Sequence, residues 1–323
     1  MKVLVTGGSS LLGRTTARAL TARGDSVTCF QRGASGTGCR DARGDVRDRD
    51  AVLAAATGQD VIVHLAALVA PRPALADAVA VNVDGTRHVL DAAEGCGRLV
   101  HVSSPSVAFA DHAVLGVGAE EPAYDGHDVY TRTKAMAERL VADRARPGVV
   151  VVRPHLVWGP GDTQLVGRIV DRARQGRLVL PDHGRALIDT TYIDDAAAAL
   201  VAATDRTADS PEAATRPWVV TGNDPRPVAE LVAGILAAHD IETTVRSVPA
   251  PVAAWAGTLL DRWWRGGEPP LTHFAARQLS VAHFFDQRDT QRVLRWVPVV
   301  GVDEGLRRLA AAVRITDHGT SRR

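Results

Sequence analysis

The sequence has little cysteine, little lysine, no charge excess and no long apolar run. Its three cysteines, Cys29, Cys39 and Cys96, show neither paired nor metal-like spacing, which predicts a reducing compartment, no disulfide framework and no metal site. The formal net charge is only +1, which argues against nucleic-acid binding by bulk charge. No apolar run approaches the roughly 18–20 residues that span a bilayer, and "MKVLVTGG" lacks the features of a signal peptide. We therefore expect a cytoplasmic protein without a transmembrane segment.

The sequence does contain strand-like and helix-like segments that alternate. Short valine-rich runs, typical of strands buried on both faces of a parallel sheet, occur at 2–7, 26–30, 60–67, 98–104, 148–154 and 217–222. Helical patterns follow them at 13–23, 48–56, 77–94, 128–144 and 193–203. This order predicts an α/β fold, a Rossmann-type doubly wound parallel sheet with a smaller mixed C-terminal substrate lobe.

The predicted domains follow the same pattern. Residues 1–160 form the dinucleotide-binding domain, and 190–222 return to it. Residues 161–189 and 223–315 form the substrate-binding lobe, and 316–323 form a disordered tail. Within the lobe, the segment at 248–264 has two readings. It is either a lobe helix that covers an apolar pocket or a helix that lies on a membrane surface.

A glycine turn, "VTGGSSLLGR", joins the first predicted strand to the first helix. This is the context in which such a turn cradles a dinucleotide, because the helix N-terminus presents N–H groups to the pyrophosphate. Ser10 stands where a middle glycine is usual, and it either fits beside the phosphates or hydrogen-bonds them. The expected cofactor-binding residues here are Gly7, Ser9, Ser10, Leu11, Leu12 and Gly13.

The second predicted strand ends at Gln31 and Arg32, where NAD-binding proteins carry an acidic residue for the ribose hydroxyls. Arg32 suits a 2′-phosphate instead, so NADP(H) is favoured over NAD(H), although a solvated surface arginine is the alternative in so arginine-rich a chain. Residues expected along the rest of the cofactor path are Asp45, Val46, Leu65, Ala66 and Ala67.

The chemistry is predicted to lie in "YTRTK", which places Tyr130 and Lys134 one helical turn apart on the same face. A neighbouring ammonium favours the phenolate and lowers the tyrosine pKa toward a useful acid/base range. Only two of the 38 basic residues are lysines, and one of them is here. Ser103 and Ser104 end a strand at the expected crevice, where either could hydrogen-bond a substrate oxygen or cap the strand.

Taken together, "TGGSSLLG", "GDVRD", "HLAA", "VSSPSV", "YTRTK" and "RPHLVWGPGD" resemble the extended short-chain dehydrogenase/reductase family. The 3β-hydroxysteroid dehydrogenase branch, which includes 2-alkyl-3-oxoalkanoate reductases, is most similar. The resemblance implies that Tyr130, Lys134 and Ser104 are catalytic and that Lys134 also holds the cofactor ribose. It also implies that Arg153 and Pro154 flank the nicotinamide, with His155 next, and that Pro154 and His155 belong to the cofactor site. It further implies a homodimer and NAD(P)-dependent oxidoreduction on a lipophilic small molecule.

Two alternatives remain. A nucleotide-sugar epimerase or dehydratase would share the fold, but "SSPSVAF" lacks the acidic pair of dehydratases, and His155 replaces a frequent asparagine of epimerases. A non-catalytic NADP-sensing protein of the same fold would typically lose the tyrosine that this chain retains.

Overall fold

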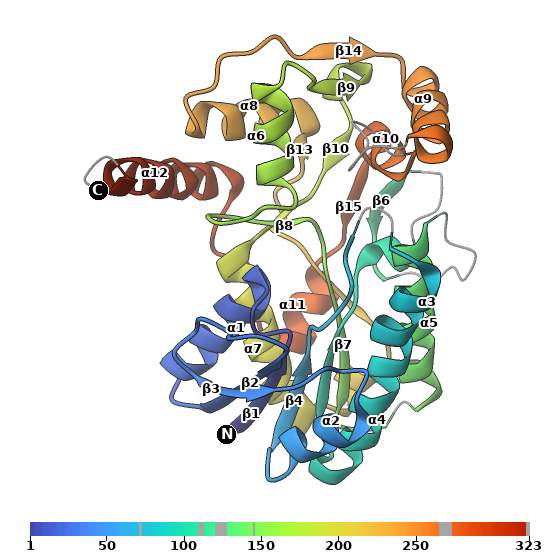
Figure 1. Ribbon diagram of the computed structural model, residues 1–323, viewed down its shortest axis with the longest axis vertical. Helices are drawn as coiled ribbons and strands as arrows, with labels where there is room; N and C mark the ends of the chain where they lie inside the picture. The colour runs from blue at the N-terminus through green and yellow to red at the C-terminus, as the bar shows by residue number, and fades with distance from the viewer. Residues whose placement is uncertain (71–72, 109–112, 120–127, 145, 265–272, 321–323) are drawn as a thin grey trace.

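The computed structural model describes the chain except residues 71–72, 109–112, 120–127, 145, 265–272 and 321–323. A seven-stranded sheet, parallel at every pairing, forms one lobe, and the predicted fold class is confirmed (Figure 1). In spatial order its strands are β12 (Trp218–Val220), β7 (Val149–Pro154), β5 (Leu99–Val102), β4 (Val61–His64), β1 (Lys2–Thr6), β2 (Ser26–Gln31) and β3 (Arg40–Arg43).

Helices cover both faces of this sheet, as the valine-rich strands require. One face carries α1 (Leu11–Ala22), α7 (Ile193–Asp209) and α11 (Arg288–Leu294). The other carries α2 (Arg49–Ala56), α4 (Gly85–Cys96) and α5 (Val129–Asp143). Before α4 come α3 (Leu75–Ala78) and a π-helical segment, η1 (Val79–Asp84).

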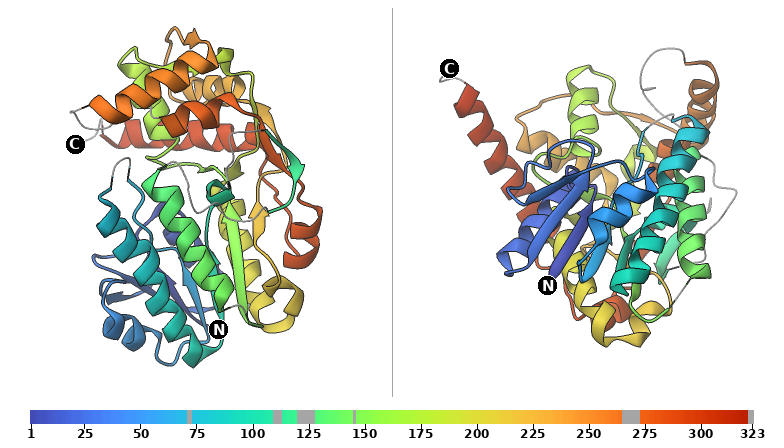
Figure 2. Two further views of the ribbon diagram at one scale, coloured as in Figure 1. Left: turned by 90° about the vertical axis from the view of Figure 1, so that its right-hand side faces the viewer. Right: turned by 60° about the horizontal axis from the view of Figure 1, so that its bottom comes forward.

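The second lobe lies beyond the carboxyl ends of the parallel strands and has a core of its own (Figures 1 and 2). Its mixed sheet has the order β13 (Arg226–Pro227), β10 (Leu187–Ile188), β15 (His283–Phe285) and β6 (Val114–Val117). Two strand pairs join β8 (Val157–Trp158) to β11 (Thr191–Tyr192) and β9 (Val179–Pro181) to β14 (Arg246–Val248). Its helices are α6 (Val166–Arg174), α8 (Val228–Ala238), α9 (Ala250–Trp263), α10 (His273–Ser280) and α12 (Val302–Thr320).

The structure differs from the predicted domain division in two places. Val293, Leu294 and Trp296 lie in 223–315 but pack in the core of the parallel sheet, because α11 folds back against α7. Helix α12 continues to Thr320, so 316–320 are helical rather than a disordered tail, and 321–323 lie outside the described residues.

Because α7 packs against the sheet, we expect the loss of one of its buried side chains to lower the stability of the protein strongly. Leu200 has no exposed surface, so replacing it with alanine should lower the free energy of unfolding by about 2–5 kcal/mol through lost burial and a residual cavity. Denaturant titration measures this loss. Val299, which is 79% exposed, provides the control, and Val299→Ala should change stability by less than about 0.5 kcal/mol. Equal losses in both variants would contradict the packing.

Candidate active site

In the glycine turn, two glycines lie so close to other backbone atoms that a side chain would not fit. Gly7 has φ +72°, and a Cβ there would lie 2.8 Å from the Ala66 nitrogen. A Cβ on Gly13 would lie 2.3 Å from the Gly7 oxygen. Both positions therefore require glycine, as expected from the sequence. This close approach packs the turn against the loop that follows β4.

Ser10 takes the middle position without strain, with φ −69°. It is the N-cap of α1: its Oγ accepts a hydrogen bond from the Gly13 nitrogen at 3.0 Å and donates one to the Gly7 oxygen at 2.9 Å. The hydroxyl proton is thus used within the turn. Of the two alternatives that the sequence leaves open, this geometry favours a serine that fits beside the phosphates and does not bind them.

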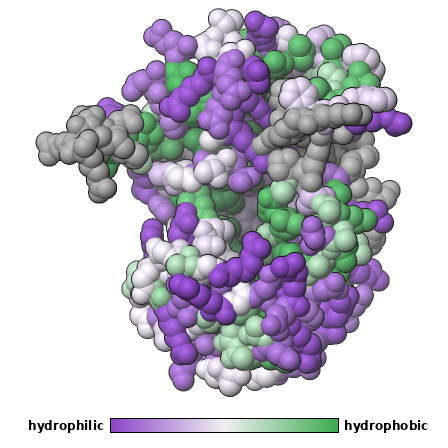
Figure 3. All heavy atoms as spheres, in the orientation of Figure 1, coloured by the Kyte–Doolittle hydropathy of each residue, from purple (hydrophilic) through white to green (hydrophobic). Residues whose placement is uncertain are grey.

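A cavity of about 590 Å³ opens at this turn, at the carboxyl edge of the sheet. The surface is hollowed between the two lobes (Figure 3). Ten of the residues that line the cavity are predicted: Gly7, Ser9, Ser10, Gln31, Arg32, Asp45, Val46, Leu65, Ala66 and Ala67. Seven more were not predicted: Phe30, Gly33, Gly44, Arg47, Leu68, Asp77 and Val81. A backbone cradle that excludes Cβ atoms, a helix N-terminus and arginines at the far end fit a dinucleotide.

The far end of the cavity carries both arginines and aspartates. Arg47 binds Asp45 with two hydrogen bonds, Nε to Oδ1 at 3.0 Å and Nη2 to Oδ2 at 2.7 Å. These bonds lower the pKa of the Asp45 carboxyl, and the charge of Arg32 lowers it further. Gln31 is turned away, because its amide nitrogen donates to Asp41 at 3.0 Å and to the Gly33 oxygen at 3.2 Å. Arg32 and Arg47 therefore supply the positive charge at this end.

Not every residue predicted to bind the cofactor lies at this cavity. The side chains of Leu11 and Leu12 pack against the hydrophobic cores. Pro154 ends β7, and His155 points into the second lobe, where its ring stands 4.9 Å from that of His283 and 5.2 Å from that of Phe285. His155 lines a separate, smaller cavity with Ser106. The structure thus places His155 against β15 of the second lobe and not at the cavity beside the glycine turn.

The predicted catalytic groups converge from α5 and the end of β5. Tyr130 forms a hydrogen bond with Ser104, and the Ser104 Oγ is 2.9 Å from the Ser106 Oγ. Ser103 is the other candidate serine, but its side chain is buried and its Oγ has no hydrogen-bond partner among the described residues. Lys134 is 5% exposed, and its Nζ donates to the Val102 oxygen at 2.7 Å. Ser104, Tyr130 and Lys134 are therefore brought together at one edge of the sheet.

The pKa of Tyr130 differs from the sequence-based expectation of a lowered value. Burial and the Asp128 charge raise the pKa of the Tyr130 phenol to about 12, and the hydrogen bond with Ser104 offsets only part of this. The Lys134 amine donates to a backbone carbonyl instead of acting on the phenol. Burial lowers the pKa of Lys134 to about 8, against the opposing charge of Glu138. At neutral pH the tyrosine therefore keeps its proton.

Sequence reasoning missed two sets of supporting residues. Asn82, on η1, accepts a hydrogen bond from the Leu68 nitrogen at 2.7 Å and donates to the Thr133 Oγ1 at 3.0 Å. It thus ties the cavity loop to the catalytic helix. π-Helical turns often mark functional positions, but the hydrophobic periodicity of the sequence does not reveal them. The second set is the buried ion pair between Glu138 and Arg153. Arg153, which was expected beside the nicotinamide, is therefore engaged by Glu138 instead.

Comparison with known proteins decides the family. The family model described as "NAD dependent epimerase/dehydratase family" matches residues 3–215. A 2-alkyl-3-oxoalkanoate reductase of Stenotrophomonas maltophilia is 40% identical over 97% of this chain and 99% of its own. The chain belongs to the NAD dependent epimerase/dehydratase family. The predicted membership of the extended short-chain dehydrogenase/reductases is thereby confirmed.

Two further proteins are similar to this chain, one in sequence and one in fold. A Stigmatella aurantiaca protein named 4-hydroxy-2-methyl-3-oxo-4-farnesyl-3,4-dihydroquinoline-1-oxide ketoreductase is 31% identical over 97% of this chain and 96% of its own. A short-chain dehydrogenase/reductase superfamily protein of Agrobacterium tumefaciens, solved with bound NAD, covers all of both chains with a TM-score of 0.77 at 24% identity. The prediction of an NAD(P)-dependent oxidoreductase is confirmed. No helix among the described residues is long and apolar enough to cross a membrane.

The cap geometry of Ser10 makes a prediction that separates stability from cofactor binding. Ser10→Ala should lower the free energy of unfolding by about 1 kcal/mol and Ser10→Gly by a few tenths. Because the hydroxyl proton is used within the turn, both variants should bind NADPH within about twofold of the parent in a fluorescence titration. A tenfold or greater loss of affinity in Ser10→Gly would show that the hydroxyl binds the pyrophosphate.

Proposed function

We propose that this protein reduces a ketone on a lipophilic substrate, such as a 2-alkyl-3-oxoalkanoate, to a secondary alcohol with NADPH. The observation that carries the proposal is a protonated tyrosine that is hydrogen-bonded to Ser104, just after β5, at the carboxyl edge of the sheet where the cavity also opens. The names of the two relatives support the substrate class, because one states a 2-alkyl-3-oxoalkanoate and the other a farnesyl-bearing ketone. We expect the protein to be cytoplasmic, in keeping with its three free cysteines.

The described residues suit the reductive direction. A bound nicotinamide supplies the hydride for the carbonyl carbon. Tyr130 holds a proton at its phenol oxygen at neutral pH and donates it to the carbonyl oxygen, which forms the alcohol. Ser104 hydrogen-bonds the same oxygen and stabilises its developing charge. Lys134, one helical turn after Tyr130, donates to the Val102 oxygen and with its remaining ammonium protons holds the ribose of the bound cofactor.

An epimerase or dehydratase remains the second candidate, since the family contains both. Elimination requires a carboxylate beside the catalytic hydroxyl, and here Ser104 is followed by Pro105 and Ser106. NADPH oxidation with β-ketoacyl compounds and ketosteroids, together with product analysis of nucleotide sugars, distinguishes the two, because epimerases and dehydratases consume no cofactor in net turnover. Turnover restricted to the nucleotide sugars would overturn the proposal.

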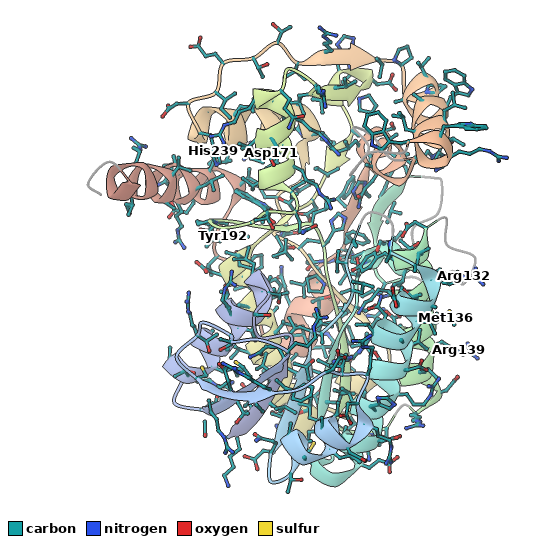
Figure 4. All side chains as sticks on the ribbon, in the orientation of Figure 1. Arg132, Met136, Arg139, Asp171, Tyr192 and His239 are labelled. Atoms are coloured by element: carbon teal, nitrogen blue, oxygen red, sulfur yellow. The ribbon has the colours of Figure 1, made fainter. Side chains whose placement is uncertain are left out.

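We also propose a homodimer that forms through α5. Arg132, Met136 and Arg139 lie along the outer face of this helix and point away from the sheet (Figure 4). Arg132 and Arg139 are exposed, and Met136 is half-buried. Mass measurement in solution tests this, and a monomer at all concentrations would contradict it.

Removal of the phenol oxygen should abolish turnover without affecting cofactor binding. Tyr130→Phe should lower kcat for a 2-alkyl-3-oxoalkanoate by at least about 100-fold, because no other group donates the proton. NADPH affinity, measured by fluorescence titration, should stay within about twofold. Tyr192 lies in the second core, with its ring 5.6 Å from that of Trp158. Tyr192→Phe is therefore the matched control and should retain most activity. Near-parental turnover of Tyr130→Phe would refute the assigned acid.

The cofactor preference should depend on Arg32. We expect Arg32→Glu to weaken NADPH binding by tenfold or more and NADH binding by less than about threefold, since only NADPH has a 2′-phosphate. Titrations with both cofactors measure the ratio. Arg18→Glu makes the same charge change on α1 outside the cavity and should leave the ratio unaltered. An equal effect on both cofactors, or a parent that prefers NADH, would contradict the role of Arg32.

A further inference from the structure

Helix α9 carries large apolar side chains on its solvent side. Val252, Trp255, Leu259 and Trp263 follow one another at spacings of three or four residues, so they form a single stripe along the helix. Their exposed fractions are 49%, 66%, 38% and 65%. We call these four residues the α9 stripe. Apolar atoms gather over α9 in the space-filling view (Figure 3).

The side of α9 opposite the stripe carries small, buried residues. Ala253 is 1% exposed, and Gly257 is buried one turn later. This side faces α10, where Ala276 has no exposed surface. The two helices lie across the front of the second lobe in the left view of Figure 2, and no described element covers α9 there. A helix that covered an apolar pocket would turn its largest side chains inward, and α9 does the reverse.

The charged residues of α9, Asp261 and Arg262, stand at its C-terminal end. Between Ala250 and Leu260 the helix has no charged residue. Arg262 is exposed, and its guanidinium lies 5.9 Å from the centre of the Trp263 ring. On α10 the charged or titratable residues are His273 and Arg277, with no acid. Asp182 is the acidic contact at the other end, and its Oδ1 accepts a hydrogen bond from the Ala250 nitrogen, which caps the helix.

These features fit a lipid surface better than a protein partner. Tryptophan favours the membrane interface, and an apolar helix face enters it by about 5–10 Å. The two exposed tryptophans are eight residues apart, about 12 Å along the helix, so both reach one flat surface. An arginine at the edge adds attraction to anionic headgroups. The surface area of four side chains on one helix is smaller than the roughly 800 Å² that each partner buries in a stable protein interface.

We propose that the α9 stripe docks this protein on the surface of an anionic lipid bilayer. The stripe enters the interface, Arg262 contacts the headgroups, and the parallel sheet stays in water. Docking brings the second lobe to the phase in which a lipophilic ketone dissolves. This last point rests on the proposed function, whereas docking itself does not.

Vesicle flotation of the full-length protein tests the docking directly. The parent should float with mixed phosphatidylcholine and phosphatidylglycerol vesicles and bind pure phosphatidylcholine several-fold more weakly. The double variant Trp255→Ser/Trp263→Ser should bind the mixed vesicles at least tenfold more weakly, because the interfacial anchors are gone. Arg262→Glu should remove most of the preference for the anionic lipid.

Controls keep the test independent of folding and of catalysis. The control Val297→Ser/Val299→Ser replaces two apolar side chains outside α9 that are 57% and 79% exposed. It should float like the parent. The tryptophan variant should keep the parental melting temperature and the parental kcat/KM for a water-soluble ketone. The proposal is overturned if the parent does not float or if the tryptophan variant floats equally well. It is also overturned if the stripe instead joins two copies, seen as a parent dimer that the tryptophan variant converts to monomer without any parent flotation.

Discussion

The burial of Lys134 is the constraint on which the rest of the site depends. An ammonium group that is 5% exposed is costly unless its protons find acceptors. The Val102 carbonyl accepts one of them at the end of β5, and the carboxylate of Glu138 lies one turn further along α5. Glu138 is in turn paired with Arg153 on β7. The charge thus fixes α5 against two neighbouring strands, and an arginine, with its larger planar head, would not fit the same space.

Fixing α5 positions both halves of the proposed chemistry. Tyr130, one turn before Lys134, is held beside Ser104 and keeps its proton, as an acid for ketone reduction must. On the far side of the same helix turn, Thr133 binds Asn82, which also binds the loop after β4. The cofactor cradle and the catalytic helix are therefore parts of one hydrogen-bonded unit, and a shift in one is expected to disturb the other.

Local pattern was enough to predict the sheet, the glycine turn and the catalytic helix, because each depends on residues close in sequence. The interaction partners of individual side chains were harder to predict. Arg153 pairs with Glu138, which lies on another element. The ring of His155 meets the rings of His283 and Phe285 edge to face, and these two residues lie more than a hundred positions later in the chain. The π-helical turn that presents Asn82 has no periodic signature. The Tyr130 pKa depends on burial in three dimensions, which a pair of residues one turn apart does not reveal.

The central claim is that a hydride moves from NADPH to a ketone carbon while Tyr130 supplies the proton. Its most direct test is mass spectrometry of the alcohol formed from a 2-alkyl-3-oxoalkanoate with NADPH deuterated at C4 on the transferred face. The account predicts one deuterium on the carbinol carbon, none at the hydroxyl after exchange, and equimolar oxidised cofactor. Alcohol without deuterium at that carbon, with either face of the cofactor labelled, would contradict it.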